Sequence, residues 1–494
     1  MKLKELLDCE NSKIPHSLLS RDINVIERNE DSANEETLFF YLKKKNENSE
    51  RIKSIISKKP LAIVTEDKEI FKGTKIPVIE VKNARESYSI AYSNFCKIDY
   101  ENLKFIGITG TNGKTTTATM LKAILENNGK KCGFIGTGKI LSKNRLLSDK
   151  DYSMTSPDPE VLYPVIKEME RDECEFIIME VSSHALALDK TSPIPFDVGI
   201  FTGLSSEHMD FHNNMDNYFL AKEKLISKAK CGIINIDDEK GLELYKKYRE
   251  KSVGVSIKSV ADVTAIDIKA EDFFGSRYIY KTNKFLTPIS LNIPGIYNIY
   301  NSMLAVSAAI HLGTLPCKCK EGLKELSTIE GRFEKIVDSI TVIIDYAHTP
   351  FALENLLKTV NHGKNTEQKI ILVFGCGGER DKEKRPIMAS VAEKYCDKII
   401  VTQDNSRNES LFEIIRDITA GFKTQKYGII SNRAVAIRHA VESANDSDIV
   451  IIAGKGHERY ILDTGGYKVF DEKAIITDAL SKRRRLKKNY ENKA

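Results

Sequence analysis

The sequence contains no tryptophan, only 13 prolines and no long hydrophobic run. A transmembrane helix needs roughly 20 consecutive apolar residues, and no stretch of the chain approaches that length. The first residues, Met1-Lys-Leu-Lys-Glu-Leu-Leu, lack the apolar core of a secretory signal. The nine cysteines are few for 494 residues, and their number is odd. These absences predict a soluble protein of the reducing cytoplasm with free thiols.

An excess of charge of one sign is also missing. The chain has 75 lysines and arginines against 70 aspartates and glutamates, which gives a net charge of +5. A basic run at residues 482–488 is typical of a solvated helix end, although such a run can also bind an anionic partner. We therefore expect a monomer that acts on small molecules, with neither nucleic acid nor a membrane as partner.

What the chain does contain is a long alternation of strand-like and helix-like segments. At 494 residues it is too long for one hydrophobic core. The alternation predicts an α/β protein with parallel sheets. We expect three domains: a small α/β domain at 1–102, a central P-loop ATPase-like domain with a parallel sheet at 103–329, and a Rossmann-like α/β domain at 330–494. The strands are expected at 38–42, 61–64, 78–81, 105–109, 176–181, 198–203, 232–235, 342–345, 370–375, 398–402 and 448–454.

A glycine-rich turn lies between one of these strands and a helical run from Ala118 to Asn127. It reads Gly107-Ile-Thr-Gly-Thr-Asn-Gly-Lys114-Thr115. In such a turn, backbone N–H groups surround phosphate oxygens, the lysine reaches the β- and γ-phosphates and the hydroxyl ligates Mg²⁺. The first glycine stands one residue earlier than in the strict P-loop pattern. The turn predicts binding of a nucleoside triphosphate, with an ordinary βα turn as the alternative.

Two polar segments follow the next two strands of the central region. Glu180 ends the strand at 176–181, where it is placed to hold Mg²⁺ opposite Thr115, with a structural hydrogen bond as the alternative. The second segment is Glu207-His208-Met-Asp-Phe-His212, and three polar groups after one strand favour a second metal position at His208.

Ten motifs in order, from about residue 31 to 475, resemble the Mur ligases. The motifs are the glycine-rich turn, Met179-Glu-Val-Ser-Ser-His, Glu207-His-Met-Asp-Phe-His, Asn217-Tyr-Phe-Leu-Ala-Lys222, Gly295-Ile-Tyr-Asn-Ile-Tyr-Asn301, Gly331-Arg-Phe-Glu, Asp345-Tyr-Ala-His-Thr-Pro, the run from Cys376 to Pro386, Asp404-Asn-Ser-Arg407 and Gly454-Lys-Gly-His-Glu458.

The resemblance implies an ATP-dependent acid–amino-acid ligase of cell-wall precursor synthesis. The γ-phosphate of ATP moves to a peptide carboxylate, and an incoming amine displaces phosphate from the acyl-phosphate. Two Mg²⁺ ions are implied, one held by Thr115 and Glu180 and the other by His208. Lys222 matches the lysine that the family carbamylates with CO₂, which converts a cation into an anion able to hold Mg²⁺.

The resemblance also assigns the ATP site. Asn298 and Asn301 correspond to contacts near the adenine, with helix packing or capping as the alternative, and Arg332 and Asp345 lie where the family closes on ATP. His348 is either part of that site or a structural turn residue. The loop contributes Gly110, Thr111, Asn112, Gly113, Lys114, Thr115 and Thr116.

A UDP-muramyl peptide is the implied acceptor, with the N-terminal domain holding the UDP end through Ser32. Thr155, Ser156 and Ser182 match substrate contacts of the family. Two departures concern this site: Leu188 and Lys190 stand where the family has glutamine and arginine, and Ala33 stands where it has arginine. A lysine is a less directional donor than the arginine that it replaces.

The third domain is expected to bind the incoming amino acid through Arg380, Asp404, Asn405, Ser406, Arg407, Gly454 and Glu458. Arg407 matches the arginine that pairs with the distal carboxylate of meso-diaminopimelate. Ser406 replaces the usual proline, so the loop shape can differ and meso-lanthionine is a second candidate. The alternatives are a lysine-adding ligase, a folylpolyglutamate synthetase-like ligase and a regulatory ATPase.

Overall fold

The computed structural model describes residues 1–7, 16–43, 49–147, 154–207, 209–271 and 275–491. Within them the strands form a four-stranded sheet, an 11-stranded sheet, a six-stranded sheet and a two-stranded hairpin. Contacts divide the chain into two compact units. The first consists of residues 1–107, 130–199 and 221–230, and the second of 108–129, 200–220 and 231–494.

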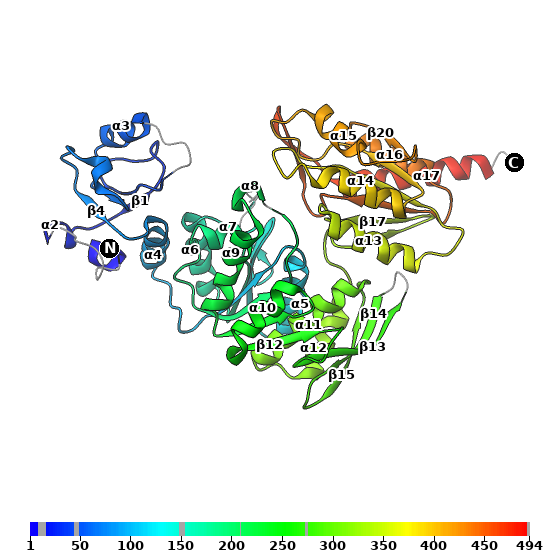
Figure 1. Ribbon diagram of the computed structural model, residues 1–494, viewed down its shortest axis with the longest axis horizontal. Helices are drawn as coiled ribbons and strands as arrows, with labels where there is room; N and C mark the ends of the chain where they lie inside the picture. Colours follow the sequence, from blue (N-terminus) through cyan, green and yellow to red (C-terminus); the bar gives the residue numbers. More distant parts are fainter. Residues whose placement is uncertain (8–15, 44–48, 148–153, 208, 272–274, 492–494) are drawn as a thin grey trace. The chain divides into compact units, whose positions relative to one another are not determined.

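The first unit begins with a small parallel sheet, drawn in blue in Figure 1. Its strands β1 (Val25–Glu27), β2 (Thr37–Phe40), β3 (Ala62–Thr65) and β4 (Val78–Glu80) pair in chain order. Leu38 and Phe40 point to one core and Phe39 to another, because successive side chains of a strand face opposite sides. The helices of this part are α1 (Leu3–Leu6), α2 (His16–Leu19), α3 (Ser49–Ser57) and α4 (Ala84–Cys96), with a 3₁₀ turn at Lys68–Phe71.

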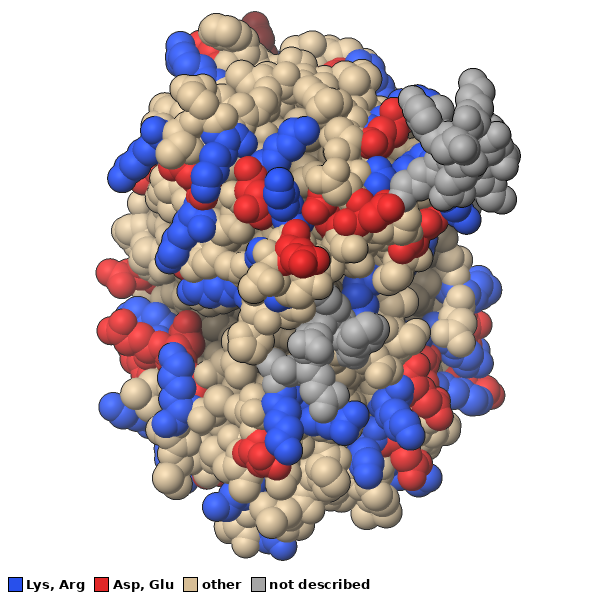
Figure 2. Space-filling view, turned by 90° about the vertical axis from the view of Figure 1, so that its right-hand side faces the viewer, with Lys and Arg blue, Asp and Glu red and all other residues tan. Residues whose placement is uncertain are grey.

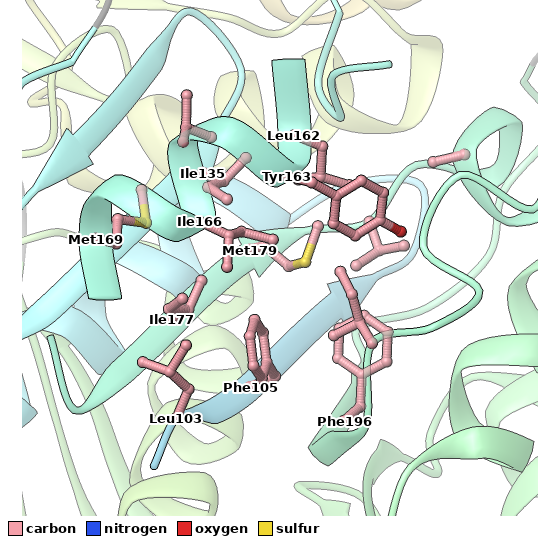
Figure 3. Close-up of a cluster of buried hydrophobic side chains, with 14 of the residues drawn as sticks. Leu103, Phe105, Ile135, Leu162, Tyr163, Ile166, Met169, Ile177, Met179 and Phe196 are labelled. Atoms are coloured by element: carbon pink, nitrogen blue, oxygen red, sulfur yellow. The ribbon is translucent and has the colours of Figure 1, made fainter. Parts of the chain in front are cut away.

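The rest of the first unit packs around one apolar cluster, which Figure 3 shows in close-up. Phe105, Ile177 and Met179 come from strands, and Leu162 and Ile166 face them from a helix at the i, i+4 spacing of an amphipathic stripe. The elements are β5 (Lys104–Thr109), β6 (Cys132–Gly136), β7 (Lys139–Ser142), β8 (Arg145–Leu146), α6 (Pro159–Arg171), β9 (Phe176–Glu180), α7 (Ser183–Ala187) and β10 (Phe196–Phe201).

The 11-stranded sheet has the order β15-β14-β13-β12-β11-β10-β5-β9-β6-β7-β8. Strands β5 and β10 contribute residues to both units. In the second unit, α5 (Lys114–Asn127) packs against α11 (Ile296–His311) and α12 (Pro316–Glu325), as seen in Figure 1. The other elements are α8 (Met209–His212), β11 (Cys231–Asn235), α10 (Glu239–Lys247), a 3₁₀ turn at Arg249–Lys251, β12 (Ser252–Ser256), β13 (Val263–Glu271), β14 (Gly275–Lys281) and β15 (Leu286–Leu291). Helix α9 (Met215–Lys228) contributes residues to both units.

The C-terminal part of the second unit is built on a six-stranded sheet of order β16-β17-β21-β18-β19-β20. Its central strands β17, β21 and β18 are parallel and nearly continuous runs of isoleucine, valine and leucine, as expected of strands buried on both faces. The strands are β16 (Glu334–Val337), β17 (Thr341–Asp345), β18 (Ile370–Phe374), β19 (Lys398–Val401), β20 (Tyr427–Ile429) and β21 (Ile449–Ala453). The helices are α13 (Pro350–Gly363), α14 (Lys384–Tyr395), α15 (Leu411–Thr419), α16 (Arg433–Ser443) and α17 (Glu472–Glu491), and β22 (Tyr460–Asp463) and β23 (Gly466–Val469) form the hairpin.

The predicted α/β class and the eleven predicted strands are confirmed, with ends that shift by one or two residues. The sequence analysis did not predict the antiparallel strands β13, β14 and β15. Their outward-facing residues are polar, and the exposed Leu286 and Ile266 blur the alternation that marks a half-buried strand. The domain boundaries at 102 and 329 stay predictions.

Positive and negative side chains alternate on the face drawn in Figure 2. The basic run near the C-terminus is partly structural, because Arg483 is buried and donates to the carbonyls of Val441 and Glu442 at the end of α16.

No helix in the described part of the chain combines the length and the apolar character needed to cross a bilayer.

Candidate active site

The glycine-rich turn connects β5 to α5 in a conformation that only glycine adopts easily. Gly110 has φ 142° and Gly113, the N-cap of α5, has φ 87°. A β-carbon on Gly113 would collide with Oδ1 of Asn301 on α11. The Nζ of Lys114 turns back over the loop and donates to the carbonyls of Gly110 (3.1 Å) and Thr111 (2.8 Å). The first turn of α5 therefore presents its N–H groups and one ammonium to the same space.

Neighbouring segments hold the turn in this shape. The Thr111 hydroxyl donates to the carbonyl of Ser205 at 3.1 Å and accepts from the N–H of Ser205 at 2.9 Å. The hydroxyl of Thr202 donates to the carbonyl of Asn112 at 2.6 Å, and Tyr218 reaches the Thr111 hydroxyl at 3.2 Å. These hydrogen bonds fix the backbone of the turn, and a turn that is already fixed loses little conformational freedom when it binds phosphate.

Asn298 and Asn301 lie in the first two turns of α11 and are both buried. Asn298 donates to the carbonyl of Pro294 at 2.7 Å, and Asn301 donates to Asn298 Oδ1 at 3.2 Å. Asn301 also accepts from the Thr117 hydroxyl of α5 at 3.3 Å. Both residues therefore make structural contacts, because Asn301 joins α11 to α5, the helix that follows the phosphate loop, and Asn298 accepts a hydrogen bond from Asn301. Their contact with adenine stays a prediction.

Arg332 reaches the phosphate loop from the segment before β16. Its guanidinium donates to the Thr115 hydroxyl at 3.1 Å and lies 4.4 Å from the centre of the Tyr346 ring. Asp345, at the end of β17, accepts from the N–H groups of Phe333 (2.7 Å) and Ala347 (2.8 Å). Burial raises the pKa of Asp345, while Arg332 and the two N–H groups oppose that shift. The structure thus places Arg332 between Thr115 and Asp345, and the ATP-binding role of these residues stays a prediction.

His348 follows β17 and contacts Glu207, which belongs to the polar segment after β10. Its Nε2 lies 2.9 Å from Glu207 Oε1, and its Nδ1 lies 2.9 Å from the carbonyl of Tyr346. A carbonyl and a carboxylate are both acceptors, so the ring makes both hydrogen bonds only when both nitrogens carry hydrogen. His348 is therefore more than a turn residue, because it joins two loops that border the phosphate site.

Arg407 lies in the loop after β19, with the left-handed φ of 54°. One guanidinium nitrogen donates to the carbonyls of Gly378 (2.7 Å) and Asn405 (3.2 Å). In the described part of the chain, no carboxylate lies within ion-pair distance of Arg407. Its side chain is only partly buried. The guanidinium is therefore positioned by backbone carbonyls while its charge remains available to a ligand.

The other predicted residues of this pocket gather around Lys455. Its Nζ lies 3.0 Å from both Asn405 Oδ1 and Glu458 Oε2, and Asn405 donates to Glu458 Oε2 at 3.0 Å. A β-carbon on Gly454, which has φ 115°, would press against Asp404 Oδ2. Ser406 is buried beside Arg407, and the side chain of Arg380 is exposed. Asp404, Asn405, Gly454 and Glu458 thus lie together around Lys455, and their role in binding the amino acid stays a prediction.

Arg385 supports the loops on which this pocket is built. It is fully buried on α14 and makes a two-point contact with Glu409, with both distances 2.8 Å. It also donates to the carbonyl of Gly377, and the N–H of Glu379 donates to Glu409 at 2.8 Å. The Arg385–Glu409 pair therefore ties the loop at 377–379 to the loop that carries Arg407.

Replacement of Glu409 by glutamine is expected to change acid stability. The hydrogen bond from Arg385 lowers the pKa of Glu409 from 4.5 to about 2. Because the folded-state pKa lies below the unfolded value, the stabilisation is complete above pH 4.5 and is lost as the pH falls toward about 2. Glu409→Gln should lower the free energy of unfolding at neutral pH and flatten its fall across that window, as measured by urea unfolding.

Glu413→Gln is the matched control, because Glu413 is exposed on α15. It should unfold like the unaltered protein at every pH. A Glu409→Gln protein with an unaltered pH profile would show that the pair does not contribute this stabilisation.

In the first unit, four predicted residues meet at the carboxyl end of β9. The Ser156 hydroxyl donates to the carbonyl of Glu180 (2.9 Å) and to the Ser182 hydroxyl (3.3 Å). The N–H of Ser182 donates back to Ser156 at 2.9 Å. Thr137, which was not predicted, donates to Thr155 at 3.0 Å and to the Glu180 carboxylate at 3.3 Å. Glu180 thus accepts the structural hydrogen bond that was the alternative to metal binding, and its role as a metal ligand stays a prediction.

Lys190 is buried, and its Nζ lies 2.6 Å from Asp158 Oδ1. Arg28 donates to the other oxygen of Asp158 at 2.7 Å. Burial acts to raise the pKa of Asp158, but the charges and hydrogen bonds of these two cations outweigh it and lower that pKa. Ser32 is exposed, whereas Ala33 is buried in the apolar core of the N-terminal sheet, so it makes no polar contact where the family has arginine.

The predicted metal ligands are divided between the units. Thr115 belongs to the second unit, and Glu180 and Lys222, both almost fully buried, belong to the first. His208 lies outside the described residues. Among the residues that the structure describes, no group of three or more acidic, histidine or cysteine side chains is arranged to hold a metal ion. The hydroxyl and carboxylate oxygens of Thr115 and Glu180 are nevertheless the donor type that suits Mg²⁺.

Two family models match this chain. The Mur ligase middle domain matches residues 108–309, and the Mur ligase, glutamate ligase domain matches residues 331–456. These ranges contain the phosphate loop and the Arg407 loop. The chain belongs to the Mur ligase family.

Relatives of similar length carry one name. The UDP-N-acetylmuramoyl-L-alanyl-D-glutamate–2,6-diaminopimelate ligase of Clostridioides difficile is 39% identical over 498 residues, covering 98% of this chain and 100% of the relative. The ligase 1 of the same name from Clostridium acetobutylicum is 35% identical over 487 residues, with 97% and 99% covered. Mur ligases are ATP- and Mg²⁺-dependent enzymes that form peptide bonds.

Solved structures share the fold of this Mur ligase. A 2,6-diaminopimelate ligase structure has a TM-score of 0.69 at 24% identity and covers 98% of this chain and 99% of its own. The folylpolyglutamate synthase of Mycobacterium tuberculosis has a TM-score of 0.62 at 17% identity and covers 74% of this chain and 91% of its own. At these identities the likeness concerns the fold alone.

Four residues of this Mur ligase site escaped the sequence analysis: Glu207, Tyr346, Arg385 and Lys455. Each lies inside a motif that the family resemblance already covered. Their partners are distant in sequence, for example 50 residues between Lys455 and Asn405 and 141 between His348 and Glu207. For Arg385 and Lys455 the available signal was a cation inside a motif already expected to form a pocket, since a cation that becomes buried needs partners.

Proposed function

We propose that this Mur ligase adds meso-2,6-diaminopimelate to UDP-N-acetylmuramoyl-L-alanyl-D-glutamate and converts ATP to ADP and phosphate. The names of the relatives from Clostridioides difficile and Clostridium acetobutylicum support the acceptor and the amino acid. The observation that carries the choice of amino acid is Arg407, whose guanidinium is held by two carbonyls and faces no carboxylate in the described chain. A free carboxylate on the ligand completes that site.

The reaction has two steps. The carboxylate of the acceptor's glutamate attacks the γ-phosphorus of ATP, the bond to the β–γ bridging oxygen breaks, and an acyl-phosphate forms as ADP leaves. The neutral amine of the diamino acid then attacks the acyl carbon, loses a proton and displaces phosphate. The phosphate loop binds the triphosphate through its N–H groups, and Lys114 places positive charge where the γ-phosphoryl group is transferred.

Arg332 and the two loops that border the phosphate site have separate roles in the reaction. Arg332 contacts Thr115, and its guanidinium is the second cation, besides Lys114, near the transferred phosphoryl group. The Glu207–His348 contact joins two loops around the phosphate site, which limits the access of water to an acyl-phosphate.

By family position, the Mg²⁺ ligands would be Thr115, Glu180, His208 and the carbamate of Lys222. When bound, Mg²⁺ neutralises the charge of the phosphate oxygens. We infer that Lys222 is carbamylated by CO₂, so that it offers carboxylate-like oxygens. The near-complete burial of Lys222 on α9 supports this, because it shields a carbamate from water.

The remaining assignments follow from this function. Peptidoglycan precursors linked to UDP are made in the cytoplasm, so we infer that location. Ser32, Thr155, Ser156, Ser182 and Lys190 would bind the UDP-muramyl dipeptide. Three domains with the boundaries 1–102, 103–329 and 330–494, and a monomeric enzyme, remain our predictions.

The proposal is tested by measuring phosphate release and product mass with the purified protein. Release from ATP should require both the UDP-muramyl dipeptide and a diamino acid. Parallel reactions with meso-diaminopimelate, meso-lanthionine and lysine identify the amino acid, because lanthionine keeps both carboxylates and lysine lacks the distal one. Phosphate release that is independent of both substrates would overturn the proposal, and a preference for lysine would overturn the choice of amino acid.

A further inference from the structure

Lys455 is the most deeply buried charge of the amino-acid pocket. It follows β21, and none of its side chain is exposed. Its Nζ contacts three of the residues predicted to bind the amino acid: Asn405 and Glu458 at 3.0 Å, and Asp404 at 3.7 Å. The ring of Tyr460 covers it, with its centre 5.2 Å away. A buried ammonium surrounded by oxygens in this way fixes the positions of all its partners.

Lys455 also decides which oxygen of Glu458 is engaged. Glu458 Oε2 accepts from Lys455 and from Asn405, both at 3.0 Å. Among the residues that the structure describes, Oε1 accepts one hydrogen bond, a long one from the hydroxyl of Tyr346 at 3.4 Å. Glu458 can therefore offer Oε1 to a ligand while Oε2 is held. Asn405 is fixed at the same time, since its Oδ1 also accepts from the N–H of Leu462 at 3.0 Å.

The charges of the pocket balance only when Lys455 is counted. Among the buried and half-buried charges of the pocket, Asp404 and Glu458 carry two negative charges and Lys455 and Arg407 carry two positive ones, whereas Arg380 is exposed to solvent. Arg433 is paired with Glu472 at 2.6 Å, so that pair adds no net charge. Burial acts to raise the pKa of Asp404, but Lys455 and Arg433 outweigh it and hold that pKa below its usual value. A neutral pocket suits a diamino diacid, whose two ammonium and two carboxylate groups sum to zero.

We propose that Lys455 is a positioning and specificity-determining residue, which orients Glu458 and Asn405 and keeps the pocket selective for a diamino diacid over lysine. This inference rests on the proposed function. Lysine carries one net positive charge, and a pocket without Lys455 has one net negative charge. Loss of the Lys455 ammonium should therefore weaken the diacid and favour lysine, although Arg407 is unchanged.

The test compares Lys455→Met with Lys473→Met. Lys473→Met removes the same charge. Lys473 pairs with the carboxylate of Glu334 at 2.6 Å and does not contact the pocket residues named above. For Lys455→Met we expect KM for diaminopimelate to rise about tenfold or more, and the ratio of kcat/KM for diaminopimelate over lysine to fall by a similar factor. KM for ATP should stay unchanged. Lys473→Met should match the unaltered enzyme in all three quantities.

Thermal unfolding shows whether Lys455→Met folds, and a second variant tests the proposal if it does not. Lys455→Arg keeps the charge but changes the donor geometry, so it should raise KM for diaminopimelate and leave the diaminopimelate-to-lysine ratio intact. An unchanged KM in Lys455→Arg would overturn the positioning role, and an unchanged ratio in a folded Lys455→Met would overturn the specificity role. An unaltered enzyme that adds neither amino acid would instead refute the proposed function itself.

Discussion

Replacement of Lys114 by methionine is expected to lower kcat by about 100- to 1,000-fold, the usual effect of removing one preorganised charged donor from a transition state. In the structure, Lys114 Nζ lies over the phosphate loop against the carbonyls of Gly110 and Thr111. The triphosphate brings oxygens to the same place, so the ammonium exchanges weak carbonyl contacts for phosphoryl oxygens. Because charge develops there during transfer, the effect should fall on kcat more than on KM for ATP.

Lys122→Met is the matched control for Lys114→Met. Lys122 lies on the same helix α5, is also largely buried, and pairs with Glu126 at 2.6 Å. Both variants should be assayed by ADP formation with saturating substrates, and their folding checked by circular dichroism. A Lys114→Met enzyme that keeps more than a tenth of the kcat would show that the lysine does not stabilise the transferred group.

Replacement of Arg407 by alanine is expected to lower kcat/KM for diaminopimelate by about 100-fold or more, since the distal carboxylate would then be buried without its cation. The effect should be selective. ATP binding should remain, because the contacts of Arg407 are with Gly378 and Asn405 and none is with the phosphate loop. Addition of lysine, which has no distal carboxylate, should fall much less.

Arg416→Ala serves as the control for Arg407→Ala, since Arg416 is an arginine on α15 whose side chain is 64% exposed. Product formation with diaminopimelate and lysine should be followed by mass spectrometry, and nucleotide binding by calorimetry. Equal losses with the two amino acids would mean that Arg407 shapes the loop and does not read the carboxylate. Arg407→Lys adds a further comparison, because an ammonium keeps the charge but loses the two-point geometry.

Much of the fold was predictable because its signals are local. Buried parallel strands such as β18 and β21 are short runs of isoleucine, leucine and valine, and the phosphate loop needs glycine at fixed spacing from lysine and threonine. The antiparallel strands β13 to β15 were not predicted, because apolar and polar residues alternate only weakly along them and because they lie between two helical regions. The cluster around Asp404 was predicted by resemblance, but its central cation was not.

The sequence by itself determined that this chain is an α/β protein with a phosphate loop, and it named most residues of the candidate sites. These properties depend on short-range patterns of glycine, apolar and polar residues. Only the tertiary structure decided how those residues are held: Lys455 between Asn405 and Glu458, Arg385 on Glu409, and His348 on Glu207. The physical reason is that hydrogen bonds and ion pairs join atoms that are near in space, and the spacing of residues along the chain does not encode those distances.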